Sequence, residues 1–352
     1  MVLDVAGSSP VIHPKTFAVS TLASSLVVAL AASCSGGGHG VSDAGRPDAA
    51  GPGPACGAGC SSGATCVASA CQCLPGYVGD GATCVPETVS SDLEARTPAE
   101  VCARWKAGQV VTASTQYVPG TGGMCDPGTI TDAAVYDAAN RWSMYRWLVG
   151  LPPVGVDRTN AADMQQCALV LGYDFRHDPP PTTTWYTAGG ADAASRSMIC
   201  SAQDAAGCMD LYTLESYATD NRLSHRKIVV GTNRDNVNFG VSSGGSCALY
   251  GYGTDPPTTP AFTAVPNPGP TPIAMARSTW SLHQTSAALP IGDTQVFDET
   301  AGAPVGVQQN LRYAGINGWD LTSPVIAGHT YRVTLSDGTS TIEYRTTPVD
   351  CP

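Results

Sequence analysis

The sequence predicts a chain of several modules: a small disulfide-rich module, a central α+β domain built as an α-β-α sandwich, and a C-terminal all-β sandwich. Six cysteines fall within the 29 residues from Cys56 to Cys84, which is typical of a module too small to fold without disulfides. Over residues 129–255, helical periodicities come first and short strand-like runs follow, an order that favours an α+β domain. After residue 280, alternating apolar runs separated by Gly, Asn and Asp predict strands.

Composition and charge exclude two classes of partner. The chain has 352 residues, a net charge of −11, and only 18 Lys and Arg residues, which form no basic run. It therefore lacks the positive patch that nucleic acid or anionic lipid headgroups require. The 14 cysteines are many for a reducing cytosol, so the sequence predicts an oxidising compartment outside the cell membrane.

The amino-terminal segment has the pattern of an export signal. The apolar run of residues 17–32 is shorter than the ~20 residues that a transmembrane helix needs. The sequence Leu30-Ala-Ala-Ser-Cys34 resembles the lipobox of bacterial lipoproteins, which implies cleavage before Cys34 and its acylation. We expect residues 1–34 to be a signal with a lipobox, residues 35–55 to be a flexible linker, and membrane contact to occur only through the lipid. The alternative is ordinary secretion, with Cys34 left as a thiol.

The cysteine-rich module spans residues 56–84. Counting alone allows fifteen pairings of its six cysteines. The run from Cys71 to Cys84, with Tyr77 and its glycines, closely resembles the end of an epidermal-growth-factor-like (EGF-like) module. The resemblance implies three bridges: Cys56–Cys66, Cys60–Cys71 and Cys73–Cys84. Calcium-binding members carry an acidic stretch before the first cysteine, but this chain has Gly53-Pro54-Ala55, so we expect no calcium here.

Residues 85–128 are predicted to be a linker followed by a short helical preface. Thr97-Pro98-Ala99-Glu100 combines a capping hydroxyl, a first-turn proline and a reciprocating glutamate, which predicts a helix to about Lys106. Cys102 lies on this helix, and Cys125 follows a Gly-rich loop just before the next helix. We expect a Cys102–Cys125 bridge that attaches the preface to the central domain.

The central domain contains three predicted helices and three predicted strands. Apolar residues recur every three or four positions in helices that begin at Asp132, near Asn160 and near Asp204. The third helix runs through Tyr217. The predicted strands are Lys227–Val230, Val237–Phe239 and Cys247–Tyr250.

Four blocks of this domain resemble the CAP superfamily, in particular its bacterial extracellular members. The superfamily unites cysteine-rich secretory proteins, antigen 5 and plant pathogenesis-related proteins. The blocks are Asn140-Arg141, residues 174–178, residues 211–217, and residues 223–230 leading to Asn238-Phe-Gly240. The resemblance implies a cleft with two histidines and two acidic residues, of which His177, Glu215 and His225 match. Arg196 replaces the fourth, because Ser195-Arg196-Ser197-Met198 stands where the family shows Gly-Glu-Asn-Leu.

Two chemistries fit these residues. Two imidazoles and one carboxylate suit a zinc ion with an open position, so His177, His225 and Glu215 are candidate metal ligands. Arg196 would repel such a cation, so any zinc should bind weakly. Arg196 can instead form a bidentate pair with Glu215, which favours a structural hydrogen-bond network with no metal.

The sequence Gly240-Val-Ser242-Ser-Gly244 matches the pattern of a serine-hydrolase nucleophile. That motif requires a strand before it and a helix after it, yet a second strand follows here. We therefore predict a hairpin turn at this position and no nucleophile. No catalytic residue can be named from the sequence.

The C-terminal part is predicted to be a Pro-rich strap over residues 256–280 and a small β-sandwich over residues 281–352. Seven prolines between residues 254 and 278 predict the strap. The sandwich resembles the immunoglobulin-like tail found after some bacterial CAP domains.

Seven cysteines remain when those of the EGF-like module and Cys34 are set aside. Because seven is an odd number, they cannot all pair with one another. Either one is free, with Cys167 the candidate, or Cys34 joins a bridge.

These observations predict a cell-surface or secreted protein that is not an enzyme. We expect its cleft to bind a small apolar or peptide ligand, and the flanking modules to act as spacers or to contact a surface protein. The first alternative is a metal-assisted hydrolase that uses His177, His225 and Glu215. The second is a purely structural or adhesion protein with a closed cleft.

Overall fold

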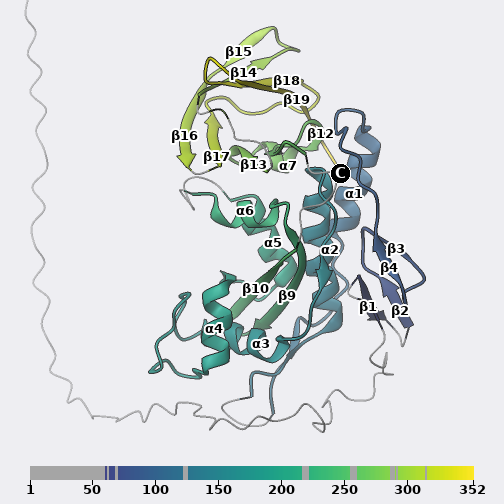
Figure 1. The fold of residues 1–352 in the computed structure, drawn as a ribbon, viewed down its shortest axis with the longest axis vertical. Helices are drawn as coiled ribbons and strands as arrows, with labels where there is room; N and C mark the ends of the chain where they lie inside the picture. The colour runs from purple at the N-terminus through teal and green to yellow at the C-terminus, as the bar shows by residue number, and fades with distance from the viewer. Residues whose placement is uncertain are drawn as a thin grey trace, which may run out of the picture. The chain divides into compact units, whose positions relative to one another are not determined.

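A computed structural model describes residues 60–61, 63–67, 70–121, 126–215, 222–253, 260–285, 290, 292–313 and 315–352 (Figure 1). The predicted signal, Cys34, the linker, Cys56 and Cys125 lie outside these residues. The described part is mixed α/β with six sheets. Its five disulfides indicate an oxidising compartment, and therefore an exported protein. No described helix is long and apolar enough to cross a membrane.

The small N-terminal module consists of two hairpins. Strand β1 (Ala64–Val67) pairs with β2 (Ala70–Cys73), and β3 (Tyr77–Gly79) pairs with β4 (Cys84–Pro86). Cys60 bonds to Cys71 and Cys73 to Cys84, the two pairs that the EGF-like resemblance implied, whereas the Cys56–Cys66 pair falls outside the description. Leu74 is 1% exposed within the core of the central domain, and Tyr77 packs against the same core. The module is therefore docked on that domain.

The helical preface begins as its capping motif predicts. In α1 (Pro98–Gln109), Thr97 accepts from the Glu100 backbone N–H while the Glu100 carboxylate accepts from the Thr97 backbone N–H. The segment after α1 forms β5 (Tyr117–Val118), which pairs with β6 (Thr129–Ile130).

The predicted Cys102–Cys125 bridge is wrong, because Cys102 bonds to Cys351. The two cysteines are 249 residues apart in sequence, and their Cα atoms are 5.0 Å apart. Figure 1 shows the C terminus beside α1. The Arg345 backbone N–H also donates to the Glu94 carboxylate at 3.1 Å, so the last strand and the segment before α1 are neighbours. This bridge therefore ties the preface to the end of the chain.

The central domain holds a four-stranded sheet between two pairs of helices. The strand order is β7 (Gly155–Val156), β9 (Arg234–Ser242), β10 (Gly245–Tyr252) and β8 (Ser197–Cys200). One face packs on α2 (Asp132–Leu148) and α5 (Ala205–Thr213), and the other on α3 (Ala161–Val170) and α4 (Ala188–Arg196). Because strand side chains alternate, β10 directs Ala248 to the first pair and Cys247 to the second.

Disulfides attach a helix to each face of this sheet. Cys167 of α3 bonds to Cys247 of β10, and Cys200 at the end of β8 bonds to Cys208 of α5. The expectation that Cys167 is the free thiol is therefore wrong.

The three helices predicted for the central domain correspond to α2, α3 and α5. The predicted strand at Lys227–Val230 is wrong, because α6 (Ser224–Val229) is a helix there. In its first turn the Arg226 backbone N–H donates to the buried Glu215 carboxylate at 2.5 Å. The first N–H groups of a helix have no partner within the helix, and Glu215 supplies a buried acceptor for one of them. This contact outweighs the strand preference of the short β-branched run at residues 227–230.

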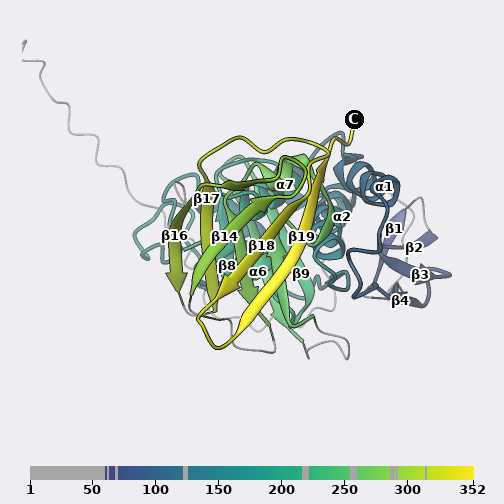
Figure 2. The same ribbon diagram turned by 90° about the horizontal axis from the view of Figure 1, so that it is seen from above.

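Two sheets that share one apolar core form the C-terminal domain. The first contains β11 (Phe262–Val265), β13 (Trp280–Gln284), β17 (Ile316–Leu321) and β16 (Val307–Tyr313), in that order. The second contains β12 (Gly269–Pro272), β19 (Thr341–Val349), β18 (Tyr331–Ser336), β14 (Asp293–Asp298) and β15 (Ala303–Val305). Figure 2 shows β14, β18 and β19 side by side. Trp280 and Trp319 of the first sheet lie in one buried cluster with Val333 and Tyr344 of the second.

The predicted strap over residues 256–280 is wrong where the structure describes it. Residues 262–265 form β11 of one sheet, residues 269–272 form β12 of the other, and α7 (Ile273–Ala276) connects them to β13. The prolines fit because β12 is an edge strand, where a missing N–H costs no hydrogen bond between strands. The β domain therefore begins before residue 281.

Candidate functional site

A small pocket in the central domain brings both predicted histidines together. Its volume is about 210 Å³. Its walls come from the loop after α3, the junction of α4 and β8, helix α6 and strand β10. The lining residues are His177, Ser195, Arg196, Ser197, Met198, Ser224, His225, Ile228 and Tyr250.

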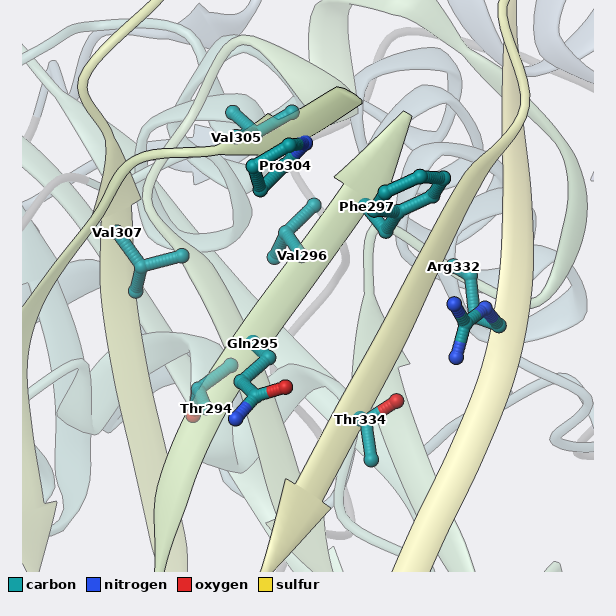
Figure 3. Close-up of a pocket in the computed structure, with 9 residues that line it drawn as sticks. All are labelled: Thr294, Gln295, Val296, Phe297, Pro304, Val305, Val307, Arg332 and Thr334. Carbon is teal, nitrogen blue, oxygen red and sulfur yellow. The ribbon is translucent and has the colours of Figure 1, made fainter. Parts of the chain in front are cut away.

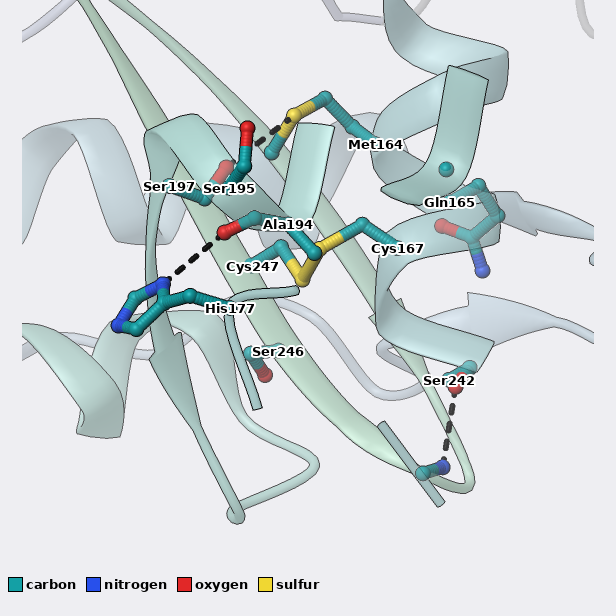
Figure 4. The surroundings of a disulfide bond; sticks show 12 residues. Met164, Gln165, Cys167, His177, Ala194, Ser195, Ser197, Ser242, Ser246 and Cys247 are labelled. Carbon is teal, nitrogen blue, oxygen red and sulfur yellow. Dashed lines mark hydrogen bonds between the residues drawn. A yellow bond between two sulfur atoms is a disulfide. The ribbon is translucent and has the colours of Figure 1, made fainter. Parts of the chain in front are cut away.

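The His177 ring is oriented by the end of α4. Its Nδ1 lies 3.0 Å from the Ala194 carbonyl oxygen, as the dashed line in Figure 4 marks. Because a carbonyl oxygen can only accept, Nδ1 carries the proton and the neutral ring keeps Nε2 as an acceptor. The Cys167–Cys247 bridge lies close to this contact and fixes α3 against the sheet. The exposed His177 is therefore held on a rigid support.

The His225 ring is oriented by Glu215. Its Nδ1 lies 3.2 Å from Glu215 Oε1, while Glu215 Oε2 accepts from the Arg226 backbone N–H. Glu215 is only 6% exposed, and the Tyr212 ring lies 5.0 Å from the His225 ring, centroid to centroid. A carboxylate that holds Nδ1–H in place fixes both the tautomer and the direction of an imidazole. Glu215 thus positions His225 and does not itself line the pocket.

Arg226 supports Glu215 from within the domain. Its fully buried guanidinium donates to the backbone oxygens of Thr213, Glu215 and Thr279 and, at 3.0 Å, to Ser281 Oγ. Burial lowers the pKa of Arg226 to about 10, so the group is still charged at neutral pH. The sequence analysis missed this residue, although it directly follows His225.

Arg196 does not pair with Glu215, so the predicted bidentate contact is wrong. Its Nη2 donates to Asp192 one turn earlier in α4, and the two side chains are 50% and 61% exposed. Arg226 takes the place beside Glu215 instead. Arg196 is a lining residue of the pocket, as are both histidines.

The three candidate metal ligands do not form a metal-binding group. Among the described residues, no three His, Cys, Asp or Glu side chains are placed to hold a metal ion. The Glu215 carboxylate is engaged by His225 and Arg226, and the His177 Nδ1 by Ala194. Weak zinc binding through His177, His225 and Glu215 stays a prediction.

Neither Ser195, Ser197 nor Ser242 shows the geometry of a nucleophile. Ser195 Oγ donates to the Asp192 carbonyl oxygen at 2.8 Å, and Ser197 Oγ contacts Met164 Sδ at 3.7 Å. Ser242 is buried in the hairpin of β9 and β10, where its Oγ accepts from the Gly244 N–H at 3.0 Å. The prediction of a hairpin at this motif is confirmed.

A larger hollow of about 340 Å³ lies on the β domain (Figure 3). Its charged lining residue, Arg332, lies over the Phe297 ring and forms ion pairs with Glu299 and Glu343. None of the described residues that line it is a histidine or an acidic residue. Size alone therefore does not make it the candidate site.

Comparison with known protein families, curated proteins and solved structures found no match to this chain. A function must therefore be argued from the pocket itself.

Proposed function

We propose that this chain is an exported binding protein of the CAP type, tethered through Cys34, whose pocket between His177 and His225 takes a small apolar or peptide ligand without catalysis. The observation that carries the proposal is the orientation of the two rings. Each imidazole is held through Nδ1, one by a carbonyl oxygen and the other by a buried carboxylate, and both rings line one pocket. Two rings held so rigidly are suited to ligand recognition.

The contacts of Ser195 and Ser197 favour binding over hydrolysis. Ser195 and Ser197 both direct their hydroxyls away from the imidazoles, and Glu215 is buried behind His225. A covalent mechanism needs a nucleophile within hydrogen-bond reach of a base. The described residues of this pocket therefore fit a receptor better than a hydrolase.

Peptide binding tests the proposal. We expect saturation-transfer NMR on the full-length chain to detect binding from a mixture of acetylated dipeptides with free and amidated carboxyl ends. His225→Ala should weaken that binding at least tenfold, because it removes a wall and a hydrogen-bonding group of the pocket. His329→Ala is the matched control, since His329 bonds to Asp298 in the β domain.

Three outcomes would contradict the proposal. The first is that no peptide binds, and the second is that His225→Ala binds as the wild type does. The third is that mass spectrometry detects cleavage of the peptides in the presence of zinc. Such cleavage would favour the metal-assisted hydrolase.

A further inference from the structure

We infer that the pocket selects a ligand with a single carboxylate, the free carboxyl end of a peptide, and that Arg196 is the residue that recognises it. This inference rests on the proposed function and names the chemistry of its ligand.

The lining of the pocket is rich in cationic and hydrogen-bonding groups. Its nine described lining residues include one arginine, two histidines, three serines and one tyrosine, and none of the nine is acidic. The hydroxyls of Ser195 and Ser197 are engaged by Asp192 and Met164. Two carboxylates that contact lining residues are already engaged, because Glu215 accepts from His225 and Arg226, and Asp192 accepts from Arg196. A buried or half-buried anion would therefore meet donors and a positive charge, and no acidic residue among the described lining residues would repel it.

Arg196 retains donors for a ligand while it contacts Asp192. That contact uses Nη2, whereas a guanidinium has five N–H groups arranged as a fork. A pair between two half-exposed side chains four residues apart in a helix contributes little to stability. A ligand carboxylate can therefore bind Arg196 without the loss of a strong contact.

The fixed charge of the lining favours one negative charge over two. Among the described lining residues, Arg196 is the only permanent cation. Because Asp192 already shares this charge, a carboxylate adds one negative charge to the pair, whereas a phosphate dianion would add two.

The size and walls of the pocket favour the end of a chain. Its volume of about 210 Å³ is below the ~300–1,000 Å³ of pockets that enclose a whole small molecule. Met198 and Ile228 add apolar surface beside the charged groups, which suits an apolar terminal side chain next to its carboxylate.

Calorimetry on the full-length chain tests the inference with four probes: acetyl-Ala-Leu, its carboxamide, acetate and inorganic phosphate. We expect wild type to bind the free acid ten- to a hundredfold more tightly than the carboxamide, because a charge-assisted bidentate contact is lost in the latter. Acetate should bind more weakly than the peptide acid, since it lacks the apolar side chain. Arg196→Gln should abolish the preference for the free acid, and Arg196→Lys should restore part of it.

Arg158→Gln provides the matched control. Arg158 is also an exposed arginine paired with an aspartate, Asp132, but it is not part of the pocket. The Arg158→Gln variant should keep the full preference for the free acid.

Equal affinity of the wild type for the acid and the carboxamide would overturn the carboxylate inference and leave the proposed function standing. Tighter binding of phosphate than of the peptide acid would also overturn it, and failure of both peptides to bind would overturn the proposed function as well.

Discussion

Arg226→Met should lower the free energy of unfolding by about 3–5 kcal/mol, the loss typical of removing one partner from a buried charged network. The side chain is fully buried and donates to Thr213 and Glu215 of the central domain and to Thr279 and Ser281 beside or within β13. Methionine fills much of the same volume but leaves these acceptors without their donor. Urea unfolding followed by tryptophan fluorescence measures the change.

Arg312→Met is the control for this substitution. Arg312 pairs with the 90% exposed Asp293 on the surface of the β domain, so its replacement should change the free energy of unfolding by less than about 1 kcal/mol. A loss below about 1 kcal/mol for Arg226→Met would show that the buried network does not stabilise the fold.

Removal of the Cys102–Cys351 bridge should destabilise the protein by about 2–5 kcal/mol. The bridge closes a loop across a sequence separation of 249 residues, and the entropy that a cross-link removes from the unfolded chain increases with loop length. The other bridges inside this loop shorten it in effect, which keeps the expected value within that range. Urea unfolding of Cys102→Ser/Cys351→Ser under non-reducing conditions measures it.

The bridge between Cys73 and Cys84 gives the comparison. It has a sequence separation of only 11 residues, so Cys73→Ser/Cys84→Ser should cost less, about 2–3 kcal/mol at most. The expectation for Cys102–Cys351 fails if its double variant unfolds at the wild-type urea concentration.

The sequence was most informative where a local rule decides the structure. The capping motif at Thr97 set the start of α1, and apolar periodicity located α2, because both depend on residues only a few positions apart. Local rules failed where a distant group decides. The run Lys227–Val230 looks like a strand, but Glu215 accepts from the Arg226 N–H and favours a helix. Cysteine spacing likewise could not pair Cys102 with Cys351, because only the folded chain brings them together.

The same distinction applies to the site. His177, Glu215 and His225 were singled out by resemblance, and the structure brings the two histidines into one pocket with Glu215 behind the second. The roles of Arg196 and Arg226 could not be assigned, since only the packing decides that Arg196 reaches Asp192 and that the Arg226 guanidinium donates to backbone oxygens, including that of Glu215. Ile228 and Tyr250 reach the pocket from a helix and a strand that share no local pattern with the histidines.

The most direct test of the central claim is to follow the histidine ring signals by two-dimensional ¹H–¹⁵N NMR while acetyl-Ala-Leu is added to the full-length chain. If the pocket binds the ligand between the two rings, the signals of His177 and His225 should shift together and give the same dissociation constant. Those of His283 and His329, which lie in the β domain, should stay unchanged. Shifts in only one of the two pocket histidines, or in neither, would contradict a binding site formed by both.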